Sequence, residues 1–234
     1  MAVISNKPHL ITFDVYSALL DVELGLTKNL IEFAADDNNL AMSAARVWRT
    51  KQLEWAAVSN SLNKTKISFE DCTTLSLSYV ANKFKLKLSD SIKKDLVAKW
   101  DSLPLYPEAD EAVVALKNMG FKIAILSNGD KKMLDAISNL FSVEFDHILS
   151  AEDAGKFKPD PSVYALPETL LGIKKEQTLH IAGGANDVVG AVSSQMPCIW
   201  SNKSGDLIMD FSYSPALEIR NLSELSAFLS NIKV

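Results

Sequence analysis

The chain has 234 residues, which is enough for one domain with a smaller inserted or appended segment. Hydrophobic residues make up 47% of it, so we expect a packed core and exclude a disordered chain. The formal net charge is -5 and the basic residues are scattered, which argues against a nucleic-acid-binding protein. No apolar run reaches the length of a membrane span, and residues 1–8 lack the apolar stretch of a secretory signal.

The two cysteines, Cys72 and Cys198, lie far apart in the sequence and near no residue with metal-ligand spacing. A single disulfide between them stays an open alternative, and reduced, partly buried thiols are the interpretation that we favour. Together with the composition, this predicts a globular cytoplasmic protein that binds neither a membrane nor nucleic acid.

The first element that the sequence predicts is a buried strand at residues 9–14, which ends on Asp14. From about residue 24 to residue 100 no further strand is predicted, and four helix-like segments follow one another. Such a stretch is typical of a helical subdomain inserted after the first strand.

The second helix-like segment runs from Met42 to about Ser59. Apolar and amide side chains three and four residues apart share one of its faces: Ala45, Trp48, Gln52 and Trp55. The third segment has Ser68 as a favourable N-cap, followed by acidic residues that suit the positive end of a helix.

Pro104 and Pro107 end the helical stretch, and strand–helix alternation resumes after them. Strands are predicted at 121–127, 145–149, 178–182 and 198–200, with helical patterns near 108–119, 131–140, 161–171 and 187–194. Pro167 falls inside the third pattern, so we expect that helix to be short, kinked or restarted. The alternation predicts an α/β fold, a parallel sheet with helices on both faces. We expect a core of residues 1–20 and 104–234, and a helical cap of residues 21–103.

Polar residues follow the predicted strands at the points where these strands end. They are Asp14, then Ser127 and Asn128, then Lys158 in a loop, and finally Asp187. Because ligands bind beyond the carboxyl ends of parallel strands, these side chains are candidates for one converging site. Each also has an ordinary structural interpretation, as a turn residue, a helix cap or a solvated surface lysine. Their order and combination favour the site.

These residues resemble the motifs of the haloacid dehalogenase superfamily. Residues 13–19 (FDVYSAL) are similar to its first motif, 124–129 (AILSNG) to the second and 158–161 (KPDP) to the third, and the glycine-rich turn ending at Asp187 resembles the fourth. Residues 48–55 (WRTKQLEW) are similar to the cap-helix signature of the L-2-haloacid dehalogenase (type II) group, which also has a tyrosine at the place of Tyr164. The resemblance covers nearly the whole chain and implies a Rossmann-like core with an inserted helical-bundle cap.

Two positions favour dehalogenation over phosphate chemistry. Phosphatases of the superfamily carry a second carboxylate two residues after the nucleophile, which protonates an alkoxide leaving group. This chain has Tyr16 there, and a phenol with a pKa near 10 is a poor proton donor at neutral pH. It also has Gly183 where those enzymes have the first acidic magnesium ligand of the fourth motif. A halide, in contrast, leaves without a proton, so dehalogenation does not need the second carboxylate.

The resemblance implies a mechanism that uses no metal and no cofactor. Asp14, kept ionised by Lys158, attacks the carbon that bears the halogen and forms an ester. Water then cleaves the ester, with Asp187 as the group that positions or activates it. Short 2-haloacids are the implied substrates, and a homodimer is implied because members of the family commonly form one.

The same resemblance assigns groups that bind the substrate. Arg49 and Asn128 would stabilise the departing halide, and Ser127 would hold the substrate carboxylate. Tyr164 would orient Lys158 or Asp14. The candidate substrate-binding residues are Tyr16, Arg49, Trp55, Ser127, Asn128 and Tyr164. For Arg49 a solvated surface position is the ordinary alternative, and for Trp55 it is packing between helices.

Three residues depart from the dehalogenase pattern. Ala18 stands where the group usually has Thr, and Ala182 and Gly184 stand where it has Ser and Asn. Each change removes a side-chain hydrogen bond near the nucleophile, worth roughly 1.5–3 kcal/mol when one group is charged. The alternatives that stay open are a different substrate, a small-molecule phosphatase, and a catalytically impaired protein that binds small anions.

Overall fold

The computed structural model describes residues 4, 7–62 and 67–232. The chain forms two compact units: a core unit, Met1–Leu20 with Leu105–Val234, and a helical unit, Asp21–Pro104. The helical unit thus ends at Pro104, whereas the sequence predicted its end at residue 103. That each unit folds as a separate domain stays a prediction. Within the described residues, no helix is long and apolar enough to cross a membrane.

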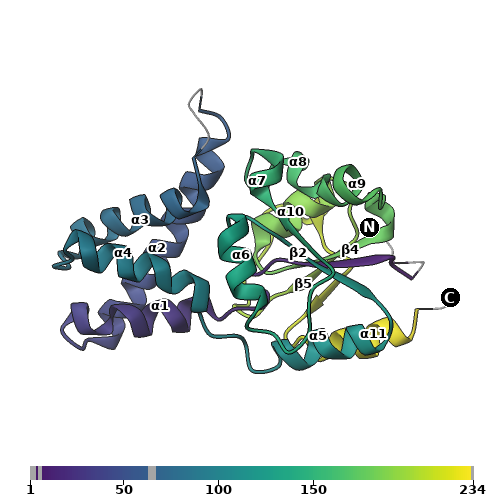
Figure 1. Ribbon diagram of the computed structural model, residues 1–234, viewed down its shortest axis with the longest axis horizontal. Helices are drawn as coiled ribbons and strands as arrows, with labels where there is room; N and C mark the ends of the chain where they lie inside the picture. Colours follow the sequence, from purple (N-terminus) through teal and green to yellow (C-terminus); the bar gives the residue numbers. More distant parts are fainter. Residues whose placement is uncertain (1–3, 5–6, 63–66, 233–234) are drawn as a thin grey trace. The chain divides into compact units, whose positions relative to one another are not determined.

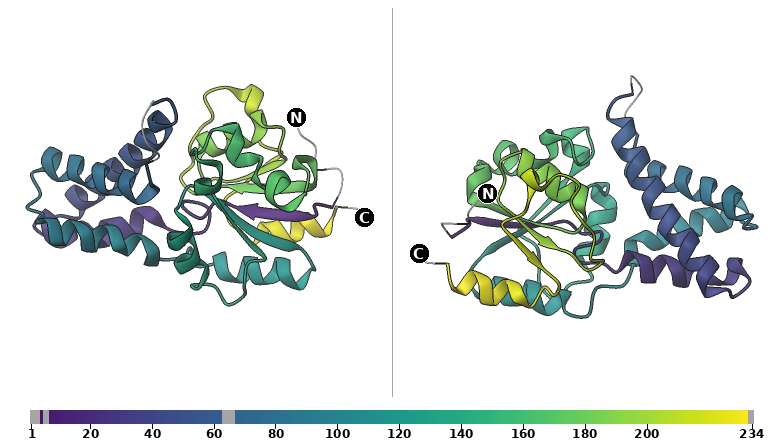
Figure 2. Two further views of the ribbon diagram at one scale, coloured as in Figure 1. Left: turned by 45° about the horizontal axis from the view of Figure 1, so that its top comes forward. Right: turned by 180° about the vertical axis from the view of Figure 1, so that it is seen from behind.

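The core unit is built on a six-stranded sheet in which every neighbouring pair of strands is parallel. The strand order is β3-β2-β1-β4-β5-β6, so the first strand lies inside the sheet, between β2 and β4 (Figure 2). The bounds are β1 Leu10–Phe13, β2 Lys122–Ser127, β3 His147–Ser150, β4 Thr178–Ala182, β5 Cys198–Ser201 and β6 Leu217–Ile219.

The two central strands β1 and β4 are buried along their whole length, as expected for strands covered on both faces. The predicted α/β fold is therefore confirmed. The short edge strand β6 escaped the sequence analysis, because its three residues make too short an apolar run to be recognised.

Helices cover both faces of this sheet (Figure 1). Helices α5 and α11 lie together on one face, and α8, α9 and α10 lie on the other. The bounds are α5 Ala109–Asn118, α6 Lys131–Ser138, α7 Ala151–Ala154, α8 Pro161–Tyr164, α9 Leu166–Leu171, α10 Ala185–Ser193 and α11 Glu224–Ser230, with 3₁₀ turns η3 Lys175–Gln177 and η4 Phe211–Tyr213.

Two helix predictions in the core need correction. The single pattern at 161–171 is in fact two short helices that meet at Ala165, with Pro167 in the first turn of the second. Proline is tolerated there because the first turn of a helix needs no N–H donor. The helix predicted at 187–194 begins two residues earlier, at Ala185, so Asp187 lies inside its first turn and is not its N-cap.

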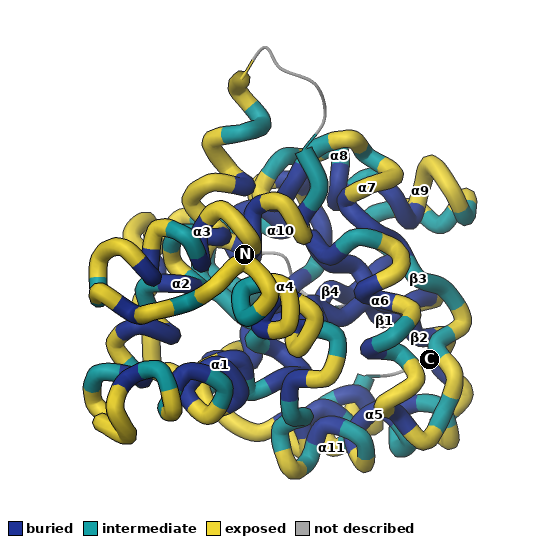
Figure 3. The backbone as a smooth tube through the Cα atoms, turned by 60° about the vertical axis from the view of Figure 1, so that its left-hand side comes forward, coloured by how far each residue is buried: buried dark blue, intermediate teal, exposed yellow. Residues whose placement is uncertain are grey.

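Among its described residues the helical unit has helices and no strand, as the sequence predicted. They are α1 Val22–Leu30, α2 Asn38–Ser59, α3 Phe69–Phe84 and α4 Asp90–Ala98, with 3₁₀ turns η1 Ile31–Ala34 and η2 Lys99–Ser102. Buried and exposed stretches alternate along these helices (Figure 3), because each turns one side to the interior of the unit.

Trp48 and Trp100 form the centre of this interior. Both are fully buried, and their rings meet edge to face with centroids 5.5 Å apart. The indole nitrogen of Trp48 donates a hydrogen bond of 2.9 Å to the Thr73 carbonyl on α3. The predicted face of α2 is correct for Trp48 and Gln52 but wrong for Trp55, which is 36% exposed, because Ala56 and not Trp55 continues the buried stripe.

The start of α3 yields a first test. The Ser68 hydroxyl accepts a 2.9 Å hydrogen bond from the Asp71 backbone N–H, and the Asp71 carboxylate accepts one of 3.0 Å from the Ser68 N–H. This capping box satisfies two N–H groups that the helix leaves without partners. We expect Ser68→Ala to lower the free energy of unfolding by about 1 kcal/mol, measured by urea denaturation.

The matched control for this test is Thr50→Ala, which removes an exposed hydroxyl from the interior of α2. We expect it to leave the free energy of unfolding within about 0.5 kcal/mol of the parent value. Equal losses in the two variants would contradict the capping argument.

Candidate active site

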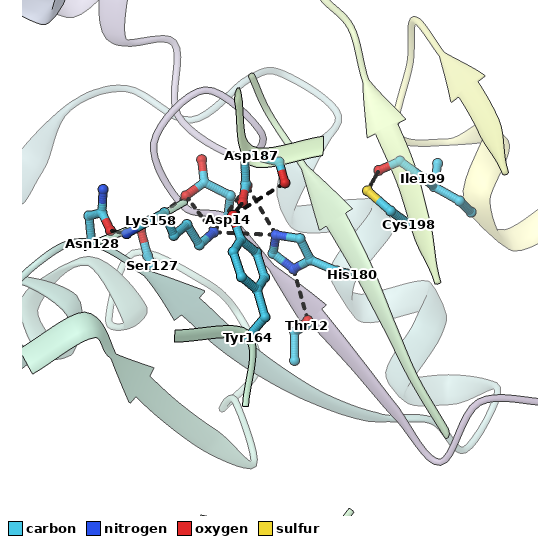
Figure 4. Close-up of polar contacts among 10 residues, drawn as sticks. All are labelled: Thr12, Asp14, Ser127, Asn128, Lys158, Tyr164, His180, Asp187, Cys198 and Ile199. Atoms are coloured by element: carbon cyan, nitrogen blue, oxygen red, sulfur yellow. Dashed lines mark hydrogen bonds and ion pairs between the residues drawn. The ribbon is translucent and has the colours of Figure 1, made fainter. Parts of the chain in front are cut away.

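Polar side chains come together at the carboxyl ends of β1 and β2 in the core unit. Asp14 directly follows β1, Ser127 is the last residue of β2, and Asn128 comes next. Lys158 comes from the loop before α8, and Asp187 from the first turn of α10. These five are the residues that the sequence predicted to converge within the core, and all five are buried (Figure 4).

Lys158 links the two carboxylates of the cluster. Its ammonium nitrogen lies 3.3 Å from Asp14 Oδ1 and 3.0 Å from Asp187 Oδ2. The Lys158 side chain is only 6% exposed, so its charge is balanced by these carboxylates more than by solvent. The Lys158 backbone N–H donates a 2.7 Å hydrogen bond to Asn128 Oδ1, which fixes the loop against the end of β2.

Asp14 accepts a second hydrogen bond from the end of β2. The Ser127 hydroxyl donates to Asp14 Oδ1 over 3.1 Å, and the Asp14 backbone N–H donates to the Ile181 carbonyl on β4 over 2.9 Å. The bond from Ser127 thus holds the Asp14 carboxylate, and the backbone bond holds residue 14 against β4. A charge-assisted hydrogen bond such as that from Ser127 favours the ionised form of a carboxyl group.

Tyr164 on α8 bonds to the second carboxylate. Its hydroxyl donates a 2.8 Å hydrogen bond to Asp187 Oδ1, whereas the resemblance implied an orienting role toward Lys158 or Asp14. Burial, together with the nearby Asp187 charge, raises the pKa of Tyr164 well above its usual value. The phenol therefore stays protonated and remains a hydrogen-bond donor.

Asp187 is held as a carboxylate by its surroundings. Burial alone would raise its pKa, but the charge of Lys158 and the hydrogen bonds from His180 and Tyr164 outweigh burial and lower the pKa below its usual range. Its place in the first turn of α10 adds to this, because the N-terminal end of a helix favours negative charge.

His180 is a member of the cluster that the sequence analysis missed. It lies on β4, is fully buried, and its Nε2 atom is 3.0 Å from Asp187 Oδ2 and 3.3 Å from Lys158 Nζ. Its Nδ1 atom is 2.9 Å from the hydroxyl oxygen of Thr12 on β1. The sequence did contain an indication of this role. His180 lies inside an apolar run, and a histidine in a buried strand needs a polar partner.

Two glycines make room for this arrangement. A Cβ atom at Gly183 would lie 2.4 Å from the Ala18 backbone nitrogen, so residue 183 packs directly on the loop that follows Asp14. A Cβ atom at Gly190 would lie 2.3 Å from the Tyr164 hydroxyl oxygen. Gly190, which the sequence analysis did not single out, therefore allows α10 to approach Tyr164 closely.

The remaining candidates take different positions. Tyr16 is buried in the core unit, with its ring close to Gly129. Arg49 and Trp55 lie on α2 of the helical unit. The Arg49 guanidinium donates a 2.7 Å hydrogen bond to Gln52 Oε1 and lies 5.8 Å from the centroid of the Trp100 ring. Their predicted roles toward a substrate stay predictions.

The residues that depart from the dehalogenase pattern also lie around the cluster. Ala18 and Ala182 are fully buried, and Gly184 is the N-cap of α10.

Both cysteines are free thiols and are buried, which excludes the disulfide alternative in this structure. Among the residues that the structure describes, no group of three or more His, Cys, Asp or Glu side chains is arranged to hold a metal ion.

Comparison with known proteins identifies the family. Residues 8–194 match the sequence model of the haloacid dehalogenase-like hydrolases. The chain is 30% identical over 221 residues to (S)-2-haloacid dehalogenase H-109 of Pseudomonas putida, covering 94% of this chain and 96% of that protein. It is 30% identical over 212 residues to haloacetate dehalogenase H-2 of Moraxella sp. (strain B), covering 90% of this chain and 92% of that protein.

A solved structure agrees with these relatives. The crystal structure of a dehalogenase with an intermediate complex superposes with a TM-score of 0.85 at 28% identity, covering 97% of this chain and 99% of that one. The resemblance drawn from the motifs is therefore confirmed, and so is the α/β core with an inserted helical unit.

The close approach at Gly190 gives a second test. We expect Gly190→Ala to lower the free energy of unfolding by about 1–3 kcal/mol, because the new methyl group must displace Tyr164 from Asp187. Urea denaturation measures the loss. The matched control is Gly184→Ser, where a Cβ atom meets no other atom within 4 Å and serine is a good N-cap. A Gly190→Ala protein as stable as the control would contradict the packing argument.

A third test uses the ionisation of Asp187. Because its pKa is lowered in the folded protein, this carboxylate stabilises the fold above the unfolded pKa of about 4, and the contribution is lost as the pH falls below that value. We expect Asp187→Asn to be much less stable than the parent at pH 7, and the difference to shrink as the pH falls from about 5 to about 2. If the difference in unfolding free energy between the parent and Asp187→Asn did not change with pH, the lowered pKa of Asp187 would be contradicted.

Proposed function

Because the chain belongs to the haloacid dehalogenase-like hydrolases, we propose that it hydrolyses the carbon–halogen bond of short (S)-2-haloacids, with Asp14 as the nucleophile. The observation that carries the proposal is the buried Lys158 ammonium between the Asp14 and Asp187 carboxylates. The 30% identity to an (S)-2-haloacid dehalogenase and to a haloacetate dehalogenase, each over nearly the whole chain, supports the substrate class.

In the first step, an Asp14 carboxylate oxygen forms a bond to the carbon that bears the halogen. The carbon–halogen bond breaks, and the halide leaves with the bonding electron pair, which inverts the configuration at that carbon. Lys158 and Ser127 keep Asp14 ionised and oriented through their contacts with Oδ1. A halide needs no proton to leave, so the absence of a carboxylate at Tyr16 costs this reaction nothing.

In the second step, water attacks the ester carbonyl carbon, the hydroxyacid leaves and the Asp14 carboxylate is regenerated. Asp187 is the group that positions this water. Its carboxylate is fixed by Tyr164 on Oδ1 and by Lys158 on Oδ2, so it keeps its geometry when Asp14 becomes a neutral ester. Its low pKa keeps it negative in the resting protein.

The other candidates bind the substrate in this proposal. Asn128 and Arg49 stabilise the departing halide, and Ser127 holds the substrate carboxylate. Tyr16 and Trp55 contribute to the walls of the substrate site. Their assignment rests on the family resemblance together with the burial of Asn128, Ser127 and Tyr16 in the core unit.

The packing of Gly183 weighs against the phosphatase alternative. An acidic magnesium ligand at this position would bring its Cβ atom to 2.4 Å from the Ala18 nitrogen and 2.5 Å from the Ser17 carbonyl carbon. Both are backbone atoms and cannot move aside as a flexible side chain would. The first acidic residue of a phosphatase's fourth motif therefore has no room on this backbone.

The test is halide release from (S)-2-chloropropionate, chloroacetate and fluoroacetate in the presence of a metal chelator. We expect release with at least one of these acids by the parent protein, and a loss of about a thousandfold or more in Asp14→Asn, because an amide is not a competent nucleophile. The matched control is Asp36→Asn, an exposed position with a positive φ that asparagine tolerates. Phosphate-ester hydrolysis without any halide release would contradict the proposal.

A second measurement addresses the ester directly. In a single turnover in ¹⁸O-labelled water, we expect the label in the Asp14 carboxyl group, because the oxygen of the product comes from the nucleophile. Mass spectrometry of the peptide that contains Asp14 detects it. Label found only in the hydroxyacid would mean that water attacks the substrate directly, and the covalent mechanism would be wrong.

A further inference from the structure

The mechanism above uses neither His180 nor Thr12, although both lie in the centre of the sheet. The two residues are register partners on the neighbouring strands β1 and β4, and both are fully buried. The hydroxyl oxygen of Thr12 lies 2.9 Å from His180 Nδ1. In Figure 4 the other side of the imidazole ring points at Asp187 and Lys158.

The Nε2 atom of His180 lies between a donor and an acceptor. Asp187 Oδ2, 3.0 Å away, can only accept a hydrogen bond, whereas Lys158 Nζ, 3.3 Å away, can only donate one. Without a hydrogen, Nε2 accepts from Lys158; with a hydrogen, it donates to Asp187. In the tautomer that carries its hydrogen on Nδ1, the ring donates this hydrogen to the Thr12 hydroxyl in both states. The site therefore provides partners for His180 with and without a proton.

The groups around the His180 ring determine how the positive charge of a protonated imidazole is balanced. The charged or titratable residues that surround His180 are Asp14 after β1, Lys158 before α8, Tyr164 on α8, Asp187 on α10 and Cys198 on β5. Burial raises the pKa of both Tyr164 and Cys198, so neither carries charge near neutral pH. The charge of the cluster therefore depends on Asp14, Lys158, Asp187 and His180.

The net charge of these four groups changes during the proposed reaction. With a neutral His180, the resting cluster holds one positive and two negative charges. Forming the ester neutralises Asp14, and hydrolysis restores its charge while releasing a proton. If His180 takes that proton, the buried cluster stays neutral through the hydrolytic step. A constant charge is favourable in an interior that solvates ions poorly.

We propose that His180 is a positioning residue that holds, through Asp187, the proton released when the ester on Asp14 is hydrolysed; this inference rests on the proposed function. The water oxygen bonds to the ester carbonyl carbon, and the bond from that carbon to the substrate oxygen breaks. One water proton goes to the departing alkoxide and completes the hydroxyacid. The other passes to Asp187 and from its Oδ2 to His180 Nε2, and it leaves for solvent before the next cycle.

The test separates the two chemical steps. His180→Gln keeps an amide that can contact Asp187 and Lys158 but cannot take up a proton at neutral pH. In rapid-mixing experiments with (S)-2-chloropropionate, we expect its first equivalent of halide within about threefold of the parent rate. We expect hydroxyacid formation to slow by about tenfold or more, so that the ester on the Asp14 peptide accumulates and is seen by mass spectrometry.

The pH profile gives a readout that a purely structural role would not affect. In the parent, the rate of ester hydrolysis should rise with pH, because the proposed step needs an imidazole that can accept a proton. In His180→Gln this rise should be absent. The matched control is His147→Gln on strand β3 of the same sheet, which should keep the parent profile.

A second variant covers the case in which His180→Gln fails to fold. Thr12→Val removes the acceptor that stabilises the protonated ring but leaves the ring in place. We expect the rise in ester hydrolysis to move to lower pH, with the halide burst unchanged.

The outcomes distinguish this inference from the proposed function. A parent protein that releases no halide from any of the haloacids would overturn the proposed function and the inference with it. A parent that turns over, with a His180→Gln variant that slows both steps equally or neither step, would overturn the inference alone.

Discussion

A single buried ammonium group between two buried carboxylates is the interaction on which the site depends. Lys158 contacts Asp14 and Asp187 within 3.3 Å, and its side chain is 6% exposed. Without that positive charge the two carboxylates would share an interior that solvates ions poorly. The Lys158 charge therefore balances both carboxylates inside the core unit. Most other polar contacts of the cluster serve to hold Lys158 or its two partners in place.

These contacts come from residues far apart in the chain, and each depends on a packing feature nearby. Asn128 at the end of β2 fixes the backbone of Lys158, and Tyr164 fixes Asp187. Tyr164 in turn needs the missing side chain of Gly190, and residue 183 needs to be glycine to pack on the loop after Asp14. Close-packed backbone and small residues thus surround the site.

The same packing gives a physical meaning to the departures from the dehalogenase pattern. Gly183 brings the turn after β4 directly against Ser17 and Ala18, so the backbone occupies space next to the loop that follows Asp14. His180, which lies on β4 itself, brings a buried imidazole into contact with Asp187. The surroundings of Asp187 therefore keep several hydrogen bonds even though Ala182 and Gly184 provide no polar side chain.

The sequence by itself determined the fold class and most of the site, because both follow from local patterns. Buried strands appear as apolar runs, and a parallel sheet places the residues after each run at one edge, so Asp14, Ser127, Asn128 and Asp187 could be grouped in advance. Tertiary structure alone decided which atoms meet. The pairing of β1 with β4 places Thr12 beside His180. The fold also brings the His180 side chain into contact with Asp187 and Lys158. The approach of α10 to Tyr164, which requires Gly190, was equally invisible, because contacts between distant segments depend on packing that no local pattern encodes.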